Sequence, residues 1–212
     1  MAGAAQARNF GVSLAKTDYV AFLDDDDLWS KDYLQGMMRY IKSTSPDCII
    51  ARLDQLIGRS VLPYKNAHGH LNKDVLLVKN PGTTDSTMVV KKNSFLKVGG
   101  CNVRLPTGYD KALVLEFMLQ GYHVVTAPDC QAILRQHEKG DRLSGSSTMA
   151  EGIFQFYKQY KNKMNFNQKI FNLLKIYKNR WMSKRDLINL LKYLIFAFLY
   201  IPKYIFLKLF KN

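Results

Sequence analysis

Four consecutive carboxylates, Asp24 to Asp27, follow an apolar, strand-like segment of the chain. Adjacent anions repel one another and raise one another's pKa, so such a run costs free energy unless something binds it. Hard divalent cations prefer oxygen ligands, and Mg²⁺ is usually held by one or two carboxylates together with substrate phosphates. Because residues two apart on an extended chain point to the same side, Asp24 and Asp26 are predicted to share one Mg²⁺ or Mn²⁺ ion.

The same run also has a purely structural interpretation. In a solvated turn followed by a helix, Asp27 and Asp32 would lie near the positive end of the helix dipole, where carboxylates are stabilised. Acidic runs are usually solvated, so the residue types alone leave both interpretations open.

Helical and strand-like patterns alternate along the first 140 residues. Helices are predicted over 3–16, 31–43, 93–100 and 110–122, and strands over 18–24, 47–53, 86–92, 123–129 and 131–137. Ser30 is the predicted N-cap of the second helix and Gly121 the C-cap of the fourth, whereas residues 54–85 are predicted to be mostly loop. This alternation is typical of α/β domains, which bind ligands beyond the carboxyl ends of their strands. The carboxylate run lies at such an end, which favours a functional site.

The charge of the chain is unevenly distributed. The whole chain of 212 residues has a formal net charge of +14, and residues 158–212 contain thirteen Lys or Arg but one acidic residue, Asp186. The body is therefore almost neutral and the tail strongly basic, which suits an anionic polymer or an anionic membrane surface. The three cysteines are far apart in the sequence, and we expect them to be reduced thiols.

Two blocks of sequence closely resemble the inverting glycosyltransferases of family 2. The first is GAAQARNFGVSLAKTDYVAFLDDDDLWSKDYL, in which an Ala-Arg-Asn helix leads to a strand and an Asp-x-Asp-Asp motif. The second comprises STMVVKKNSFLKVGGCNVRL, YDKALVLEFMLQGY and ILRQHEKGDRLS, in the order that the family has them. The resemblance implies an α/β fold of the GT-A type, a partial Rossmann-like mixed sheet followed by a helical C-terminal extension.

The resemblance also implies roles for particular residues. Asp24 and Asp26 match the metal-binding Asp-x-Asp motif, with Asp26 the more direct ligand of Mg²⁺ or Mn²⁺. Asp110 matches the general base that deprotonates the acceptor hydroxyl, although it could instead be only the N-cap of its helix. The implied reaction is the metal-assisted, inverting transfer of a sugar from a nucleotide-diphosphosugar to a growing cell-envelope glycan, of the capsule or lipopolysaccharide type.

Five residues are expected to bind the nucleotide-sugar donor. Arg8 matches the Arg of Ala-Arg-Asn, on the nucleotide side, and Asp24 and Asp25 of the carboxylate run are expected to bind the donor with it. Arg135 and His137 match the closing Arg-x-His segment and are expected to contact the diphosphate or to close the site.

The chain departs from the family pattern in two places. Position 109 is Tyr where the family most often has an acid, so the acid pair is reduced to Asp110. The family's N-terminal nucleotide-binding segments, including a Val-Asp-Asp-Gly-Ser sequence, have no counterpart here. We therefore expect a fragment that leaves part of a sheet unpaired, and a possible partner chain that supplies the missing part. The alternative function is a catalytically inactive fragment or accessory subunit that binds a membrane or a partner glycosyltransferase.

The predicted domains are a catalytic domain over 1–150 and a basic amphipathic helical tail over 151–212. The uninterrupted apolar core of the tail, residues 193–202, is only ten residues long, whereas a membrane span needs about twenty. Residues 153–212 are therefore predicted to lie on the membrane surface, peripheral on the cytoplasmic face, near a glycan or polyprenyl-linked acceptor. Packing on the domain or dimerisation is the alternative. No nucleic-acid partner is expected, because the tail is rich in Phe, Leu and Ile.

Overall fold

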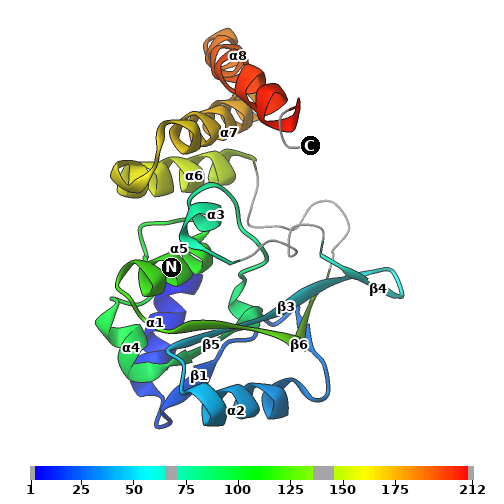
Figure 1. Cartoon of the computed structure of the whole chain (residues 1–212), viewed down its shortest axis with the longest axis vertical. Coiled ribbons are helices and arrows are strands. Elements are labelled where there is room, and N and C mark those ends of the chain that lie inside the picture. The colour runs from blue at the N-terminus through cyan, green and yellow to red at the C-terminus, as the bar shows by residue number, and fades with distance from the viewer. Residues whose placement is uncertain (1–2, 65–70, 136–145, 210–212) are drawn as a thin grey trace. The chain divides into compact units, whose positions relative to one another are not determined.

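The computed structural model describes residues 3–64, 71–135 and 146–209 (Figure 1). The chain divides into two compact units. The first contains Met1–Val103 and Tyr109–Asp141 and is built around a mixed sheet. The second contains Arg104–Gly108 and Arg142–Asn212 and is helical.

The sheet of the first unit has the strand order β1-β5-β3-β6-β2, with β4 paired to the far end of β3. The strands are β1 (Tyr19–Ala21), β2 (Leu28–Trp29), β3 (Cys48–Ile57), β4 (Ser60–Pro63), β5 (Met88–Lys91) and β6 (Val124–Arg135). The pair β3–β6 is parallel and the other pairs are antiparallel. The predicted mixed α/β fold is therefore confirmed.

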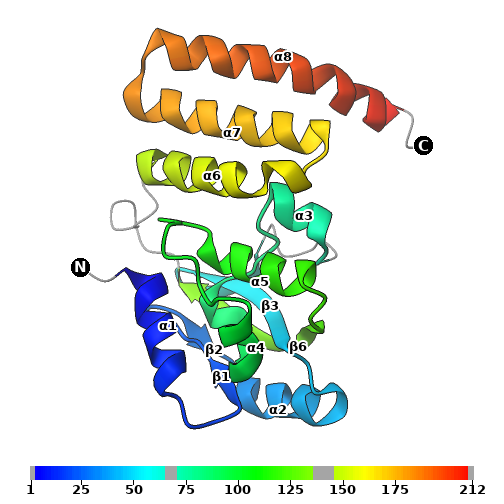
Figure 2. The same ribbon diagram turned by 90° about the vertical axis from the view of Figure 1, so that its left-hand side faces the viewer.

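Helices cover both faces of this sheet. The helices of this unit are α1 (Ala4–Leu14), α2 (Tyr33–Thr44), α3 (Lys73–Val78), α4 (Lys92–Lys97) and α5 (Tyr109–Leu119), of which α3 packs on α5. Figures 1 and 2 show α2 and α5 on opposite sides of the sheet. Tyr33 and Met37 of α2 pack on the strand residues of one core cluster, and α5 is buried around most of its circumference. Because both faces of β3 are covered, its residues from Cys48 to Ala51 are all buried, so the strand reads as a continuous apolar run.

The predicted glycine cap of α5 is present. Gly121 has a φ of +79°. Its N–H donates to the Met118 carbonyl, and the Tyr122 N–H donates to the Phe117 carbonyl at 2.9 Å. This is a Schellman motif, and the edge-to-face contact between Phe117 and Tyr122 supplies its usual hydrophobic contact.

Three predictions of local structure are wrong. Residues 54–85 are not mostly loop, since they contain the end of β3, the strand β4, the helix α3 and the 3₁₀ turn η1 (Asp85–Thr87). The two strands predicted over 123–129 and 131–137 are one strand, β6, in which a bulge between Ala127 and Gln131 shifts the register against β3. Ser30 is not an N-cap, because its N–H pairs with the Gln131 carbonyl and α2 begins only after Asp32.

The second unit contains three long helices, α6 (Ser146–Tyr160), α7 (Phe166–Lys184) and α8 (Leu187–Leu209). Asn165 and Gln168 form a capping box that starts α7. Three aromatic pairs, Phe171–Tyr200, Tyr177–Phe196 and Trp181–Tyr193, hold α7 against α8. Among the described helices, none combines the length and the hydropathy required to cross a bilayer.

Candidate active site

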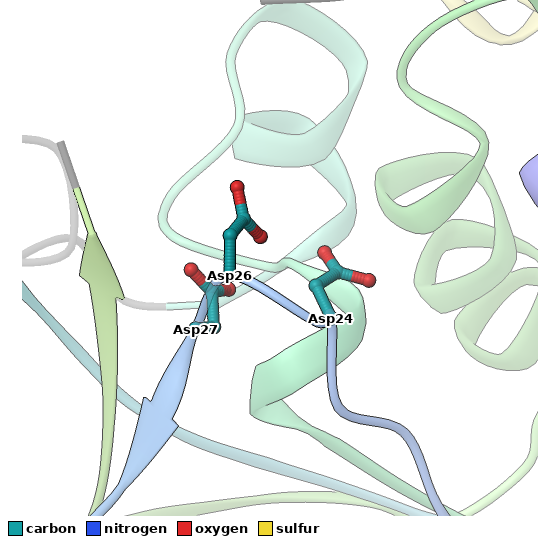
Figure 3. A group of neighbouring side chains, drawn as sticks. All are labelled: Asp24, Asp26 and Asp27. Carbon is teal, nitrogen blue, oxygen red and sulfur yellow. The ribbon is translucent and has the colours of Figure 1, made fainter. Parts of the chain in front are cut away.

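The carboxylate run forms a turn between β1 and β2. The Asp27 N–H donates to the Asp24 carbonyl at 3.2 Å, so the run is not the extended chain assumed from its spacing. The turn nevertheless brings carboxylate oxygens of Asp24, Asp26 and Asp27 within 4.8 Å of one another (Figure 3). Three carboxylates at this separation are a donor set that suits a hard divalent cation.

Asp27 is not the solvated residue of the structural interpretation, since only 5% of it is exposed. The Ser86 hydroxyl donates to its Oδ2 at 2.7 Å, and the Arg135 N–H lies 3.3 Å from its Oδ1. Burial raises the pKa of Asp27, while these two hydrogen bonds oppose that shift. Its carboxylate is thus oriented by two segments that lie far away in the sequence.

Ser86 fixes the turn from the other side. Besides donating to Asp27, its Oγ accepts the Asp24 N–H at 3.1 Å. Its carbonyl accepts from the Trp29 indole at 2.8 Å and from the Tyr33 hydroxyl at 3.1 Å. The Trp29 and Tyr33 rings stack with centroids 4.4 Å apart. One residue therefore ties the turn, β2 and α2 to the start of β5.

Arg8 links the turn to a second buried carboxylate. From α1, its guanidinium forms ion pairs with Asp24 and, at 2.9 Å through Nε, with Asp85 Oδ2. Burial raises the pKa of Asp24, and the charge of Arg8 opposes that shift. Burial and the nearby charge of Asp110 raise the pKa of Asp85 to about 7.

Tyr109 and Asp110 open α5 beside this network. The Tyr109 hydroxyl donates to Asp85 Oδ2 at 2.7 Å, and the Arg8 guanidinium lies 5.6 Å from the centre of the Tyr109 ring. Burial raises the pKa of the Tyr109 phenol, which therefore stays protonated and able to donate. Asp110 lies within the first turn of α5, because the helix starts at Tyr109. Burial raises its pKa to about 6.

The segment that contains Arg8, Asp24 and Asp85 matches a known protein family. Residues 2–104 match the model described as glycosyl transferase family 2. This segment belongs to that family. The match covers the helix, the turn and the strands that bring Arg8, Asp24 and Asp85 together.

Three known proteins illustrate what this chain is similar to. The poly(ribitol-phosphate) beta-N-acetylglucosaminyltransferase TarP of Staphylococcus aureus (strain N315) is 25% identical over 172 residues, which are 76% of this chain and 53% of TarP. The solved structure of S. aureus TarS 1–349 with UDP-GlcNAc has a TM-score of 0.60 at 14% identity, covering 92% of this chain and 60% of that one. The structure of GalNAc-T7 with UDP, GalNAc and Mn²⁺ has a TM-score of 0.53 at 13% identity, covering 80% of this chain and 40% of that one.

These structural neighbours share the fold with this chain. The chain spans about half the length of TarP.

The other predicted site residues are less closely grouped. Asp25 is exposed and lies outside the three-carboxylate group. The side chain of Arg135, the last residue of β6, is exposed, while its main-chain N–H contacts Asp27. His137 lies outside the described residues. The predicted roles of these three residues stay predictions.

Sequence reasoning missed Asp85, Ser86 and the buried role of Asp27. A signal for the first two was available, because a carboxylate and a hydroxyl directly precede the strand β5. Since β5 runs antiparallel to β1, its first residues lie at the sheet edge where β1 ends, beside the carboxylate run.

Proposed function

We propose that this chain is the catalytic part of an inverting glycosyltransferase that moves a sugar from a nucleotide-diphosphosugar to a hydroxyl of a cell-envelope glycan. The observation that carries the proposal is the convergence of Arg8, Asp24, Asp85 and Asp110, which come from four separate segments of the chain, the first three of them within the family 2 match. Ion pairs join the first three, and the charge of Asp110 acts on Asp85. Perturbed carboxyl pKa values beside charged partners are typical of functional sites.

Asp24, Asp26 and Asp27 would hold Mg²⁺ or Mn²⁺. Their oxygen donors fit such an ion, and one structural neighbour was solved with UDP and Mn²⁺. A divalent ion bound there would offset the charge of the donor's diphosphate and make it a better leaving group. Ser86 would keep Asp24 and Asp27 oriented through its two hydrogen bonds.

Asp110 is the proposed general base. With a pKa of about 6 it is mostly ionised at neutral pH, yet basic enough to accept a proton from an acceptor hydroxyl. A base with a pKa near the working pH is the most efficient kind, because it combines the correct ionisation state with proton affinity. Attack by the activated hydroxyl at the anomeric carbon, opposite the leaving diphosphate, would invert its configuration.

UDP-GlcNAc is the first donor to test, since TarS was solved with it and the name of TarP specifies N-acetylglucosamine transfer. Acceptors should include capsule-type and lipopolysaccharide-type glycans and also poly(ribitol phosphate), which the name of TarP introduces. The assay is UDP release from each donor with Mn²⁺ or Mg²⁺, with and without acceptor.

Asp26→Ala should abolish metal-dependent turnover, whereas Asp32→Ala, which removes an exposed carboxylate outside the group, should not. Turnover that survives Asp26→Ala would overturn the metal assignment.

The tail is proposed to bind an anionic membrane surface on the cytoplasmic side. Tyr193, Phe196 and Tyr200 of α8 contact α7. At about 100° per residue, a second stripe falls on the opposite side of α8. Its large apolar side chains are exposed, namely Leu187, Ile188, Leu191, Leu194, Ile195, Phe198 and Leu199. An exposed aliphatic stripe on a strongly basic unit suits insertion among anionic headgroups.

Vesicle co-sedimentation tests the membrane proposal. The chain should bind phosphatidylcholine vesicles that contain phosphatidylglycerol much better than pure phosphatidylcholine vesicles. The double variant Leu191→Glu with Ile195→Glu should lose that binding, because both side chains are exposed and their loss leaves the α7 contacts intact. Dimerisation would be supported instead if the wild-type chain bound neither kind of vesicle and formed dimers, while the double variant stayed monomeric.

An accessory role is the second candidate function. In the part of the chain that the structure describes, β1 is an edge strand paired with β5. Phe10 and Leu14 of α1 are 65% and 63% exposed. Exposed apolar side chains and a strand edge suit a partner chain that completes the domain. Co-expression with a family 2 nucleotide-binding segment should yield a stable complex, and turnover found only in that complex would favour this candidate.

A further inference from the structure

The residue at the position of the family's missing acid contacts a carboxylate from elsewhere in the chain. Tyr109 donates to Asp85 Oδ2 at 2.7 Å although Asp85 lies 24 residues earlier. The same oxygen accepts from Arg8 Nε at 2.9 Å, and Arg8 also pairs with Asp24. Asp85 therefore connects the turn of the carboxylate run to the start of α5.

Asp85 is held in this position at an energetic cost. It is 4% exposed, and within the described residues no hydrogen-bond donor reaches its buried Oδ1. An unsatisfied buried carboxylate oxygen is unfavourable, and such exceptions in native proteins often coincide with function. A residue that served packing alone could be apolar at less cost.

We propose that Asp85 supplies the carboxylate that the acid pair lacks at position 109. It acts as a positioning residue that holds Tyr109 and Arg8. Through Tyr109 it fixes the first turn of α5, and with it Asp110, on the acceptor side. Through Arg8 it fixes Asp24 on the donor side. This role rests on the proposed glycosyltransferase function and adds a residue that the family motifs at 24–27 and 109–110 do not contain.

The test is steady-state kinetics on the full chain with UDP-GlcNAc as donor and three variants. Tyr109→Phe keeps the ring but removes one hydrogen bond, and it should lower kcat about 10-fold while the donor KM stays within about twofold, since a hydrogen bond to a charged group is lost on the acceptor side alone. Asp85→Ala loses both contacts, so kcat should fall and the donor KM should rise, each by about 10-fold or more. Asp85→Asn keeps an oxygen that accepts from Tyr109 and Arg8, and it should recover much of kcat.

Asp54→Ala is the matched control. Asp54 is also a buried carboxylate whose Oδ1 meets no hydrogen-bond donor in the described part of the chain, but its other oxygen pairs with Arg52 and Gln131. Asp54→Ala should cost stability without lowering kcat or raising the donor KM.

Each outcome decides a separate question. A folded wild-type chain without turnover refutes the proposed function, and the role of Asp85 falls with it. An active wild type whose folded Asp85→Ala variant keeps both constants, or an Asp54→Ala variant with the same losses, refutes the role of Asp85 alone. If Asp85→Ala does not fold, an unchanged kcat in Tyr109→Phe refutes it equally.

Discussion

Asp85 should make the protein less stable as the pH rises, and Asp85→Asn should remove this dependence. The pKa of Asp85 is raised from 3.8 to about 7 in the folded chain. A carboxyl whose folded pKa lies above its unfolded value binds its proton more tightly when folded. The favourable contribution of Asp85 to the stability of the folded chain is fully present below pH 3.8 and is lost as the pH rises to about 7.

The expected size of the effect follows from the shift. About three pKa units at 1.36 kcal/mol per unit correspond to roughly 4 kcal/mol, of which about 3 kcal/mol is lost between pH 5 and pH 8. Asp85 is almost completely buried, so solvent screening reduces this free-energy change only a little. Set against a typical stability of about 5–15 kcal/mol for a native protein, such a loss is easily measured.

The assay is urea unfolding of the wild type and Asp85→Asn at several pH values between 5 and 8, with EDTA present so that bound cations do not contribute. The difference in unfolding free energy between the two proteins should change by about 3 kcal/mol in favour of the variant as the pH rises. Asp129→Asn is a control without pH dependence, because a hydrogen bond from Tyr40 lowers the pKa of the exposed Asp129 below 3.8, so this carboxyl is ionised in the folded and the unfolded chain throughout this pH range. Parallel stability curves for the wild type and Asp85→Asn would refute the reasoning.

Three further predictions concern the site and its support. Turnover should fall below about pH 6 as Asp110 becomes protonated, and Asp110→Asn should lower kcat about 10²–10⁴-fold at all pH values; a pH profile that stays flat to pH 5 would contradict its role as base. Ser86→Ala should weaken Mn²⁺ binding about 10-fold or more, measured by calorimetry, because Asp24 and Asp27 lose their shared partner; an unchanged affinity would argue against that support. Gly36→Ala should cost about 1–3 kcal/mol, because a Cβ there would lie 2.4 Å from the Cys130 Sγ. Adding Cys130→Ala should recover part of that loss in urea unfolding, and the idea fails if the two changes are simply additive.

Local signals in the sequence predicted the elements whose causes are local. The helices α1, α2 and α5 follow from apolar spacing, and Gly121 ends α5 through a backbone conformation that glycine adopts easily. The hairpin of β3 and β4 was also predictable but was missed. Gly58, with a φ of +59°, occupies the first position of its two-residue loop, where a type II′ turn requires glycine.

Other features depend on contacts between distant segments. The bulge in β6 depends on its register against β3, and the close approach of Gly36 to Cys130 depends on how α2 packs on that bulge. The residues of the site likewise differ in whether local sequence or long-range contacts determine their positions. The closeness of the Asp24 and Asp26 carboxylates was predicted from an extended chain, whereas a turn brings them together, and the partners of Asp85 become visible only once β5 is paired antiparallel with β1.

The central claim is that the turn at Asp24–Asp27 forms a working diphosphate site, and calorimetry of UDP binding tests it most directly. The purified chain, shown to be folded by circular dichroism, should bind UDP only when Mn²⁺ or Mg²⁺ is present. Asp26→Ala should abolish this binding and Asp32→Ala should preserve it. Metal-dependent binding that is lost in Asp26→Ala alone would support the site, whereas absence of binding in the folded wild type, or equal binding without metal, would contradict it.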